Sequence, residues 1–191
     1  MNSEESYYES GGCLHENCPV WINSEQKIIA SQLKPNTTII DGEGNETYIK
    51  IVTRKKCIDG AAPMSIICED VCLTPYHPVC IPDNNDIKKW YFPIDVEGAE
   101  NIKCEYYYNF VLENGGSLIC GLDCIEVCTL GHGQQGPVLG HCFYGCGDTN
   151  DPNGIVSQLN SLFPNHNGEI DLTNTIEIRD PTNGNRVIGL R

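Results

Sequence analysis

The sequence has 191 residues, and its 26 acidic residues against 12 basic ones give a formal net charge of −14. This length predicts one domain with extensions at its ends, and 40% hydrophobic residues are enough for a core. The acidic composition argues against binding to nucleic acid or to an anionic membrane, because both need a basic surface. The sequence contains no run of 18 apolar residues and therefore predicts no membrane span. The polar residues 1–10 do not resemble a signal peptide. We therefore expect a cytoplasmic protein.

Cysteine is the unusual feature of the composition, with 12 residues in the chain. Because no signal peptide is visible, reduced thiols buried in the core are the simplest expectation, and disulfides remain open. A metal site also remains open, because several cysteines are spaced four apart: Cys68/Cys72, Cys120/Cys124/Cys128 and Cys142/Cys146. Zinc knuckles usually have the spacing C-x2-C, which the sequence lacks. We expect no metal and no cofactor at the functional site.

Short strands separated by turns dominate most of the sequence. Residues 1–12 contain almost no aliphatic side chains and predict a flexible flank that ends in two glycines. Strands are expected at 19–22, 26–29, 37–40, 48–54, 64–68, 71–74, 88–92, 105–112, 117–120 and 125–130. Residues 78–86 should lead into and form a loop, and two lysines predict that 88–92 is an edge strand. The turn Asn114-Gly115-Gly116 predicts that 105–112 and 117–120 pair as a hairpin.

The composition changes after Gly147. Residues 148–154 are rich in Asp, Asn and Gly and predict a linker, and 155–163 has apolar residues at helical spacing. The tail, 175–191, is expected to be extended around an Asp180-Pro181 turn. We therefore predict a mostly β fold with one short helix in the C-terminal extension. Its parts are an N-terminal flank (1–12), a domain (13–146) and an extension (147–191) that packs on the domain or continues it.

Cys13 follows Gly11 and Gly12 and opens the strand-rich region. Its thiol can attack the carbonyl of Gly12 through a five-membered ring, which converts the peptide bond into a thioester. This reaction needs an activated thiol, a proton donor for the departing nitrogen and hydrogen-bond donors for the oxyanion. Glycine on the acyl side adds no bulk and tolerates a strained backbone. A buried cysteine after a loop is the alternative interpretation of the same residues.

Thr74 and His77 are the residues that we expect to assist Cys13. At the end of a strand, the spacing T-x-x-H places a hydroxyl and an imidazole close together across a turn, and the prolines at 75 and 78 would stiffen that turn. Histidine suits the donation of a proton to an amide nitrogen near neutral pH. The alternative is a histidine in a surface loop.

These motifs, in this order, resemble the hedgehog/intein (Hint) superfamily. The resemblance rests on Cys13, on Thr74-Pro75-Tyr76-His77-Pro78-Val79 and on the strand 107–112. The late segments Val127-Cys128-Thr129-Leu130-Gly131-His132-Gly133 and His141-Cys142-Phe143-Tyr144-Gly145 are similar to the Vint branch, intein-like domains found with von Willebrand type A domains. The tail 179–190 is also similar to the end of such domains, so the resemblance runs from Cys13 to about the C-terminus.

The resemblance implies a horseshoe-like β fold with pseudo-twofold symmetry and an autocatalytic, single-turnover cleavage of the chain in cis. It implies that Cys13 is the nucleophile, that Gly12–Cys13 is the scissile bond, and that Thr74 and His77 hold and protonate the amide. It also places His132 opposite these residues, although a structural role is equally compatible with the two flanking glycines. For His141 we favour a structural role.

The sequence departs from splicing inteins because no His-Asn pair ends the late strand at Leu130. His166-Asn167 is followed by glycine and predicts a turn in the tail. We therefore expect cleavage of the N-terminal flank, with water, a thiol or an amine as the acceptor and a fused upstream domain as possible cargo, and no splicing. The alternatives are a Hint-fold binding module without chemistry and a cysteine-rich metal-binding protein.

Overall fold

The computed structural model describes residues 12–82 and 87–191. The flexible flank predicted for residues 1–12 therefore lies, apart from Gly12, outside the described residues, as does most of the loop predicted around 82–86. No helix in the described ranges is both long and apolar enough to cross a membrane.

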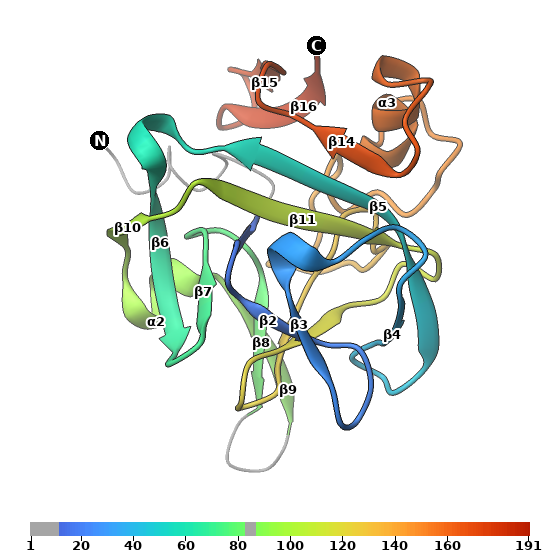
Figure 1. The fold of residues 1–191 in the computed structure, drawn as a ribbon. Helices are drawn as coiled ribbons and strands as arrows, with labels where there is room; N and C mark the ends of the chain where they lie inside the picture. The colour runs from blue at the N-terminus through green and yellow to red at the C-terminus, as the bar shows by residue number, and fades with distance from the viewer. Residues whose placement is uncertain (1–11, 83–86) are drawn as a thin grey trace.

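Most strands of the described residues belong to two sheets (Figure 1). The large sheet has the order β10 (Glu100–Lys103), β6 (Ala61–Cys68), β7 (Val71–Leu73), β1 (Leu14–His15), β11 (Tyr106–Leu112), β5 (Glu46–Lys56) and β14 (Glu169–Asp171), with β4 (Thr38–Ile40) paired to β5. The small sheet has the order β3 (Lys27–Ile29), β2 (Pro19–Trp21), β12 (Leu118–Cys120), β13 (Ile125–Val127), β8 (Val79–Pro82) and β9 (Lys88–Tyr91). The fold is thus mostly β, as the sequence predicts.

The remaining elements are short. They are the hairpin β15 (Glu177–Asp180) and β16 (Arg186–Leu190), the helices α2 (Pro93–Glu97) and α3 (Ile155–Leu162), and the 3-10 turns η1 (Ala30–Gln32) and η2 (Ile58–Gly60). Helix α3 confirms the helix predicted at 155–163. Its residues Ile155, Val156 and Leu159 are buried, at the spacing that aligns them on one helix face.

The long strands β5 and β11 lie between two hydrophobic clusters because their side chains alternate between the faces of the sheet. Val52 and Phe110 belong to the cluster that the large sheet shares with the small sheet. Their neighbours Ile51 and Val111 belong to a second cluster with residues of the C-terminal segment, which we define as 147–191. In Figure 1, α3, β14, β15 and β16 accordingly gather on one side of β5 and β11, and β2, β3, β8 and β9 lie on the other.

The predicted hairpin of residues 105–112 and 117–120 is wrong. Strand β11 pairs with β5 and β1, whereas β12 pairs with β13 and β2 in the other sheet. The glycine turn between them passes the chain from one sheet to the other, and Asn114 anchors it by donating a hydrogen bond to Asp41 (Nδ2 to Oδ2, 2.6 Å). Both partners of β11 come from distant parts of the chain.

Three other predictions need correction. Residues 79–82, expected to lead into a loop, form β8 in the small sheet. The strand expected at 125–130 ends at Val127, and Leu130 makes an isolated bridge with Val111. A second helix, α2, begins at Pro93 and is too short to show a helical period. The edge position predicted for 88–92 is confirmed, because β9 is the last strand of the small sheet.

Candidate active site

The Gly12–Cys13 peptide lies at the centre of the large sheet, directly before β1. The two neighbours of β1 are β7 and β11, and both pairs are antiparallel. This register places the peptide between Thr74, which follows β7, and Asn109, which lies within β11. Residues about sixty and about one hundred positions apart in the sequence therefore meet at one peptide bond.

Thr74 holds the nitrogen side of this peptide. The Cys13 amide N–H donates a hydrogen bond to Thr74 Oγ1 at 2.8 Å, and the Thr74 amide donates to the Cys13 carbonyl at 3.0 Å. Thr74 also begins a turn, because the His77 amide donates to its carbonyl at 3.1 Å. The sequence predicted this pairing of Thr74 and His77 across a turn stiffened by proline.

His77 is completely buried behind the same peptide. Its Nε2 lies 2.8 Å from the carbonyl oxygen of Cys128, and because a carbonyl only accepts, Nε2 carries the proton. Nδ1 is then an unprotonated nitrogen, and it has no hydrogen-bond partner among the described residues. Burial lowers the pKa of His77 to about 4, more than its contacts with the backbone of Cys128 and Cys13 raise it, so the ring is neutral at pH 7.

The position before Cys13 has no room for a side chain. A Cβ atom on Gly12 would lie 2.2 to 2.4 Å from the Cα, Cβ and Cγ atoms of His77. These distances are far inside van der Waals contact, and the nearest atom belongs to the backbone. Glycine is therefore required at position 12 by the approach of His77.

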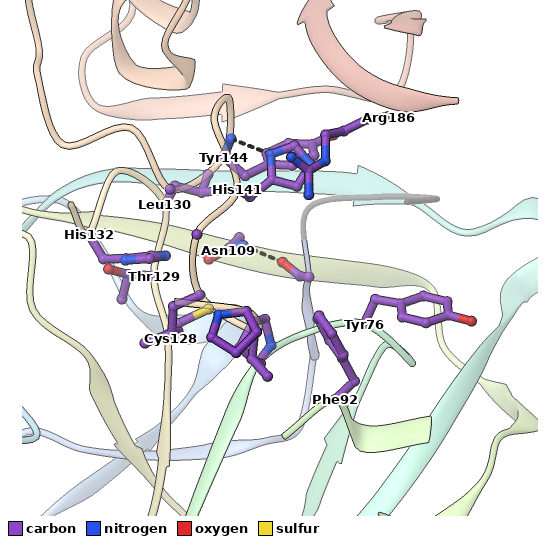
Figure 2. A pocket seen from close by; sticks show the side chains of 17 residues that line it. Tyr76, Phe92, Asn109, Cys128, Thr129, Leu130, His132, His141, Tyr144 and Arg186 are labelled. Carbon is purple, nitrogen blue, oxygen red and sulfur yellow. Dashed lines mark hydrogen bonds between the residues drawn. The ribbon is translucent and has the colours of Figure 1, made fainter. Parts of the chain in front are cut away.

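Asn109 is the site residue that sequence reasoning missed. Its Nδ2 donates a hydrogen bond to the carbonyl oxygen of Gly12 (Figure 2), and its Oδ1 accepts from the Phe110 amide at 2.8 Å. The side chain is 4% exposed, on the strand face that also carries Val111. A polar residue inside an otherwise apolar strand was the available signal, because buried polar groups need partners.

The Cys13 side chain faces the C-terminal segment. It lines a cavity of about 50 Å³, which we call the Cys13 cavity, together with residues such as Lys55, Ile155 and Glu177. Burial raises the pKa of the Cys13 thiol, an effect that the Lys55 ammonium opposes and the Glu177 carboxylate strengthens. Glu177 is itself fixed by a hydrogen bond from the Tyr144 hydroxyl at 2.9 Å.

A second cavity, of about 60 Å³, opens beside Gly12, and we call it the Gly12 cavity (Figure 2). His132 lines it together with Asn109, but among the described residues no hydrogen bond joins His132 to Cys13, Thr74 or His77. The nearby charge of His132 does lower the pKa of His77. The structure thus brings Cys13, Thr74 and His77 into contact and leaves His132 at the wall of the cavity.

The histidine rings at this cavity are both held in one orientation. His132 Nδ1 accepts a hydrogen bond from the Gln134 amide at 3.0 Å, and Gly131 and Gly133 flank it at positive φ. His141 Nδ1 accepts from two successive backbone amides at 3.2 Å each. In both neutral rings the proton is therefore on Nε2, and burial lowers the pKa of each to about 4.

The cysteines at C-x3-C spacing do not gather as metal ligands in the described ranges. None of the twelve cysteines, all within the described residues, forms a disulfide, and six are buried. The grouping with metal-ligand spacing is His15, Glu16 and Cys104, not a set of C-x3-C cysteines. Both ring nitrogens of His15 and both carboxylate oxygens of Glu16 already have backbone partners, which satisfies this group without a metal ion.

Comparison with protein families places the chain. The model of the Vint family, described as a Hint-domain, matches residues 12–189. The chain belongs to the Vint family. This match begins at the residue that precedes Cys13 and covers the C-terminal segment as far as Gly189. A search of curated proteins finds no match.

Solved structures similar to this Vint domain are inteins and intein-like domains. A bacterial intein-like domain from Clostridium thermocellum has 12% identity and a TM-score of 0.47, over 63% of this chain and 100% of that one. The gp41-1 intein has 11% identity and a TM-score of 0.43, over 63% and 100%. A KlbA intein precursor from Methanococcus jannaschii has 16% identity and a TM-score of 0.40, over 68% and 94%.

Proposed function

We propose that this Vint domain cleaves its own chain at the Gly12–Cys13 peptide through an N-to-S acyl shift. The observation that supports this most directly is the pair of side-chain hydrogen bonds to that one peptide. Its carbonyl oxygen accepts a hydrogen bond from Asn109, and its N–H donates to Thr74. Both groups that change charge during the reaction thus have a side-chain partner in place.

In the first step Cys13 Sγ attacks the carbonyl carbon of Gly12. The S–C bond forms, negative charge develops on the Gly12 oxygen, and the Asn109 amide stabilises it there. The C–N bond then breaks, the thiol proton ends on the Cys13 nitrogen, and the products are a thioester and a free amine. Atoms and charge balance without any co-reactant.

His77 carries the proton in this scheme. Its neutral ring packs against Gly12 and has an unprotonated Nδ1, which takes the proton only as the Cys13 sulfur attacks, because a pKa of about 4 makes the ring a weak base. A ring whose pKa is lowered to about 4 is a strong acid once protonated, and it gives the proton readily to the departing nitrogen. Thr74 Oγ1 accepts a hydrogen bond from that nitrogen and so fixes its orientation.

In the second step an acceptor attacks the thioester, releases the flank that ends at Gly12 and regenerates the Cys13 thiol. Water, a thiol or an amine can serve, since each adds to the Gly12 carbonyl and expels the thiolate. Splicing would also need a second cut. His166-Asn167-Gly168 leads through a bend at 167–168 into β14, and none of these residues lines the Gly12 cavity or the Cys13 cavity. The reaction therefore ends with release or transfer of the flank.

One observation favours a second candidate, a Hint-fold binding module without chemistry. Burial raises the pKa of the Cys13 thiol, which lowers the fraction of thiolate at neutral pH. In that case Cys13 would be a buried, slowly reacting cysteine, and the site would only bind its ligand.

Intact mass spectrometry of the full chain, with and without dithiothreitol or hydroxylamine, tests the proposal. We expect wild type to lose the mass of residues 1–12, Cys13→Ala to stay intact, and Cys142→Ala, a change at an exposed cysteine, to behave as wild type. An intact wild-type chain with slow alkylation of Cys13 would overturn self-cleavage and favour the binding module. Equal cleavage of wild type and Cys13→Ala would overturn the thioester.

A further inference from the structure

The Gly12 cavity has a composition unlike that of the molecule as a whole. The chain carries 26 acidic and 12 basic residues, yet among the described residues that line this cavity none is acidic and Arg186 is basic. The Nε2–H groups of His132 and His141 are hydrogen-bond donors, since their Nδ1 atoms accept from the backbone. A cation with added donors in a partly buried setting suits a carboxylate.

The other wall of the cavity is aromatic. Tyr76 and Phe92 meet edge to face with ring centroids 5.8 Å apart, and Pro78 lies beside them. In the view of Figure 2, Asn109 lies between Arg186 and His141 on one side and Phe92 on the other. The cavity thus combines an apolar wall with an anion-binding wall, and Gly12 lines it.

The residues that precede Gly12 have the complementary chemistry. They include Tyr7, Tyr8 and Glu9, and the ten residues that open the sequence carry acidic side chains and no basic one. Chain connectivity limits their distance, because each residue spans at most about 3.6 Å. Glu9 is therefore within about 11 Å of Gly12 in any conformation, which makes the cavity reachable for it.

We propose that the Gly12 cavity is the subsite that recognises residues 7–11 as the substrate segment, with Arg186 binding the Glu9 carboxylate and Tyr76 and Phe92 contacting the tyrosines. This rests on the proposed function only in calling the segment a substrate. Sterics at His77 select glycine at position 12, and this subsite adds selection further upstream. This Vint domain would then cleave flanks of acidic and aromatic character in preference to others.

Charge reversal in the full chain tests the subsite through the cleavage rate. We expect Glu9→Lys and Arg186→Glu each to slow release of residues 1–12 about tenfold, and the double variant to recover to within about threefold of wild type. Glu4→Lys, a reversal five residues further from the cavity, is the matched control and should leave the rate unchanged. A double variant as slow as the product of the single effects would overturn the proposal.

A second measurement does not depend on cleavage. In the Cys13→Ala background, chymotrypsin cuts after Tyr7 and Tyr8 are followed by mass spectrometry. We expect Arg186→Gln, or Tyr76→Ala should the first variant fold poorly, to speed these cuts about tenfold. Unchanged cutting in both folded variants would overturn the subsite. If this protection depends on Arg186 while the wild-type chain, with Cys13 present, also stays intact, the subsite is upheld and the proposed function is refuted instead.

Discussion

Among the described residues, Asn109 is the one whose side chain donates a hydrogen bond to the Gly12 carbonyl oxygen. Removal of one donor from an oxyanion site costs about 10²- to 10³-fold in rate. We therefore expect Asn109→Ala to slow thioester formation by about this factor, measured as release of residues 1–12 with a saturating thiol. The chemistry of Cys13 and His77 is untouched by this change.

The control is Asn114→Ala, which removes an asparagine that is hydrogen-bonded to Asp41 in the turn after β11 and that lines neither the Gly12 cavity nor the Cys13 cavity. It should cleave at close to the wild-type rate. Because Asn109 Oδ1 also accepts from Phe110, urea unfolding of both variants must show that they fold. A folded Asn109→Ala protein that cleaves within about threefold of wild type would contradict the oxyanion role.

The residues of the site could be predicted from the sequence to different degrees. Cys13 and the pair Thr74 and His77 could be proposed because their chemistry is local, namely a thiol beside a glycine carbonyl and a hydroxyl and imidazole across a turn. The partner of Asn109 is 97 positions away, and no spacing rule connects the two. Only the general requirement that buried polar groups be satisfied marked Asn109 as unusual.

At the scale of elements, strand positions could be predicted better than strand partners. Alternation and β-branched residues located β5 and β11 because these signals lie within each strand. Pairing depends on contacts between distant segments, and the two partners of β11 begin near residues 14 and 46. The glycine turn after β11 satisfied the local rule for a hairpin, but the chain uses it to move between sheets.

The cover formed by α3 gives a prediction at this scale. Leu159 is fully buried against the face of β5 and β11 that carries Asn109 and Val111, and Leu162, one turn later, is 40% exposed. Leu159→Ala should lower the free energy of unfolding by about 2–5 kcal/mol because it leaves a cavity. Since Ile155 of the same helix lines the Cys13 cavity, Cys13 should also react faster with iodoacetamide.

Leu162→Ala provides the matched control, with a cost below about 1 kcal/mol and unchanged alkylation of Cys13. Urea unfolding and mass-resolved alkylation measure the two quantities. Equal costs for the two variants, or a stability loss without faster alkylation, would show that α3 does not restrict access to Cys13.

At the scale of the whole molecule, three histidines from distant parts of the chain lie around the site, His77 fully buried and His132 and His141 half-buried. Burial lowers the pKa values of His77, His132 and His141 to about 4, below the value of about 6.5 expected in the unfolded chain. Near pH 5 the unfolded state therefore binds about three more protons than the folded state. Where the unfolded state binds more protons, the free energy of unfolding decreases as the pH is lowered. It should therefore decrease as the pH drops from about 7 to about 4.

The net charge of −14 acts in the opposite direction, since protonation of carboxylates relieves repulsion in the folded state. Three protons correspond to about 4 kcal/mol per pH unit, whereas salt at 0.15 M screens charges beyond about 8 Å. We therefore expect the histidines to dominate, with a lower urea midpoint at pH 5 than at pH 7. His141→Gln should reduce this pH dependence by about a third. A midpoint at pH 5 equal to that at pH 7 would mean that these rings are not held neutral, and His77 would then lack the acidity that the proton transfer requires.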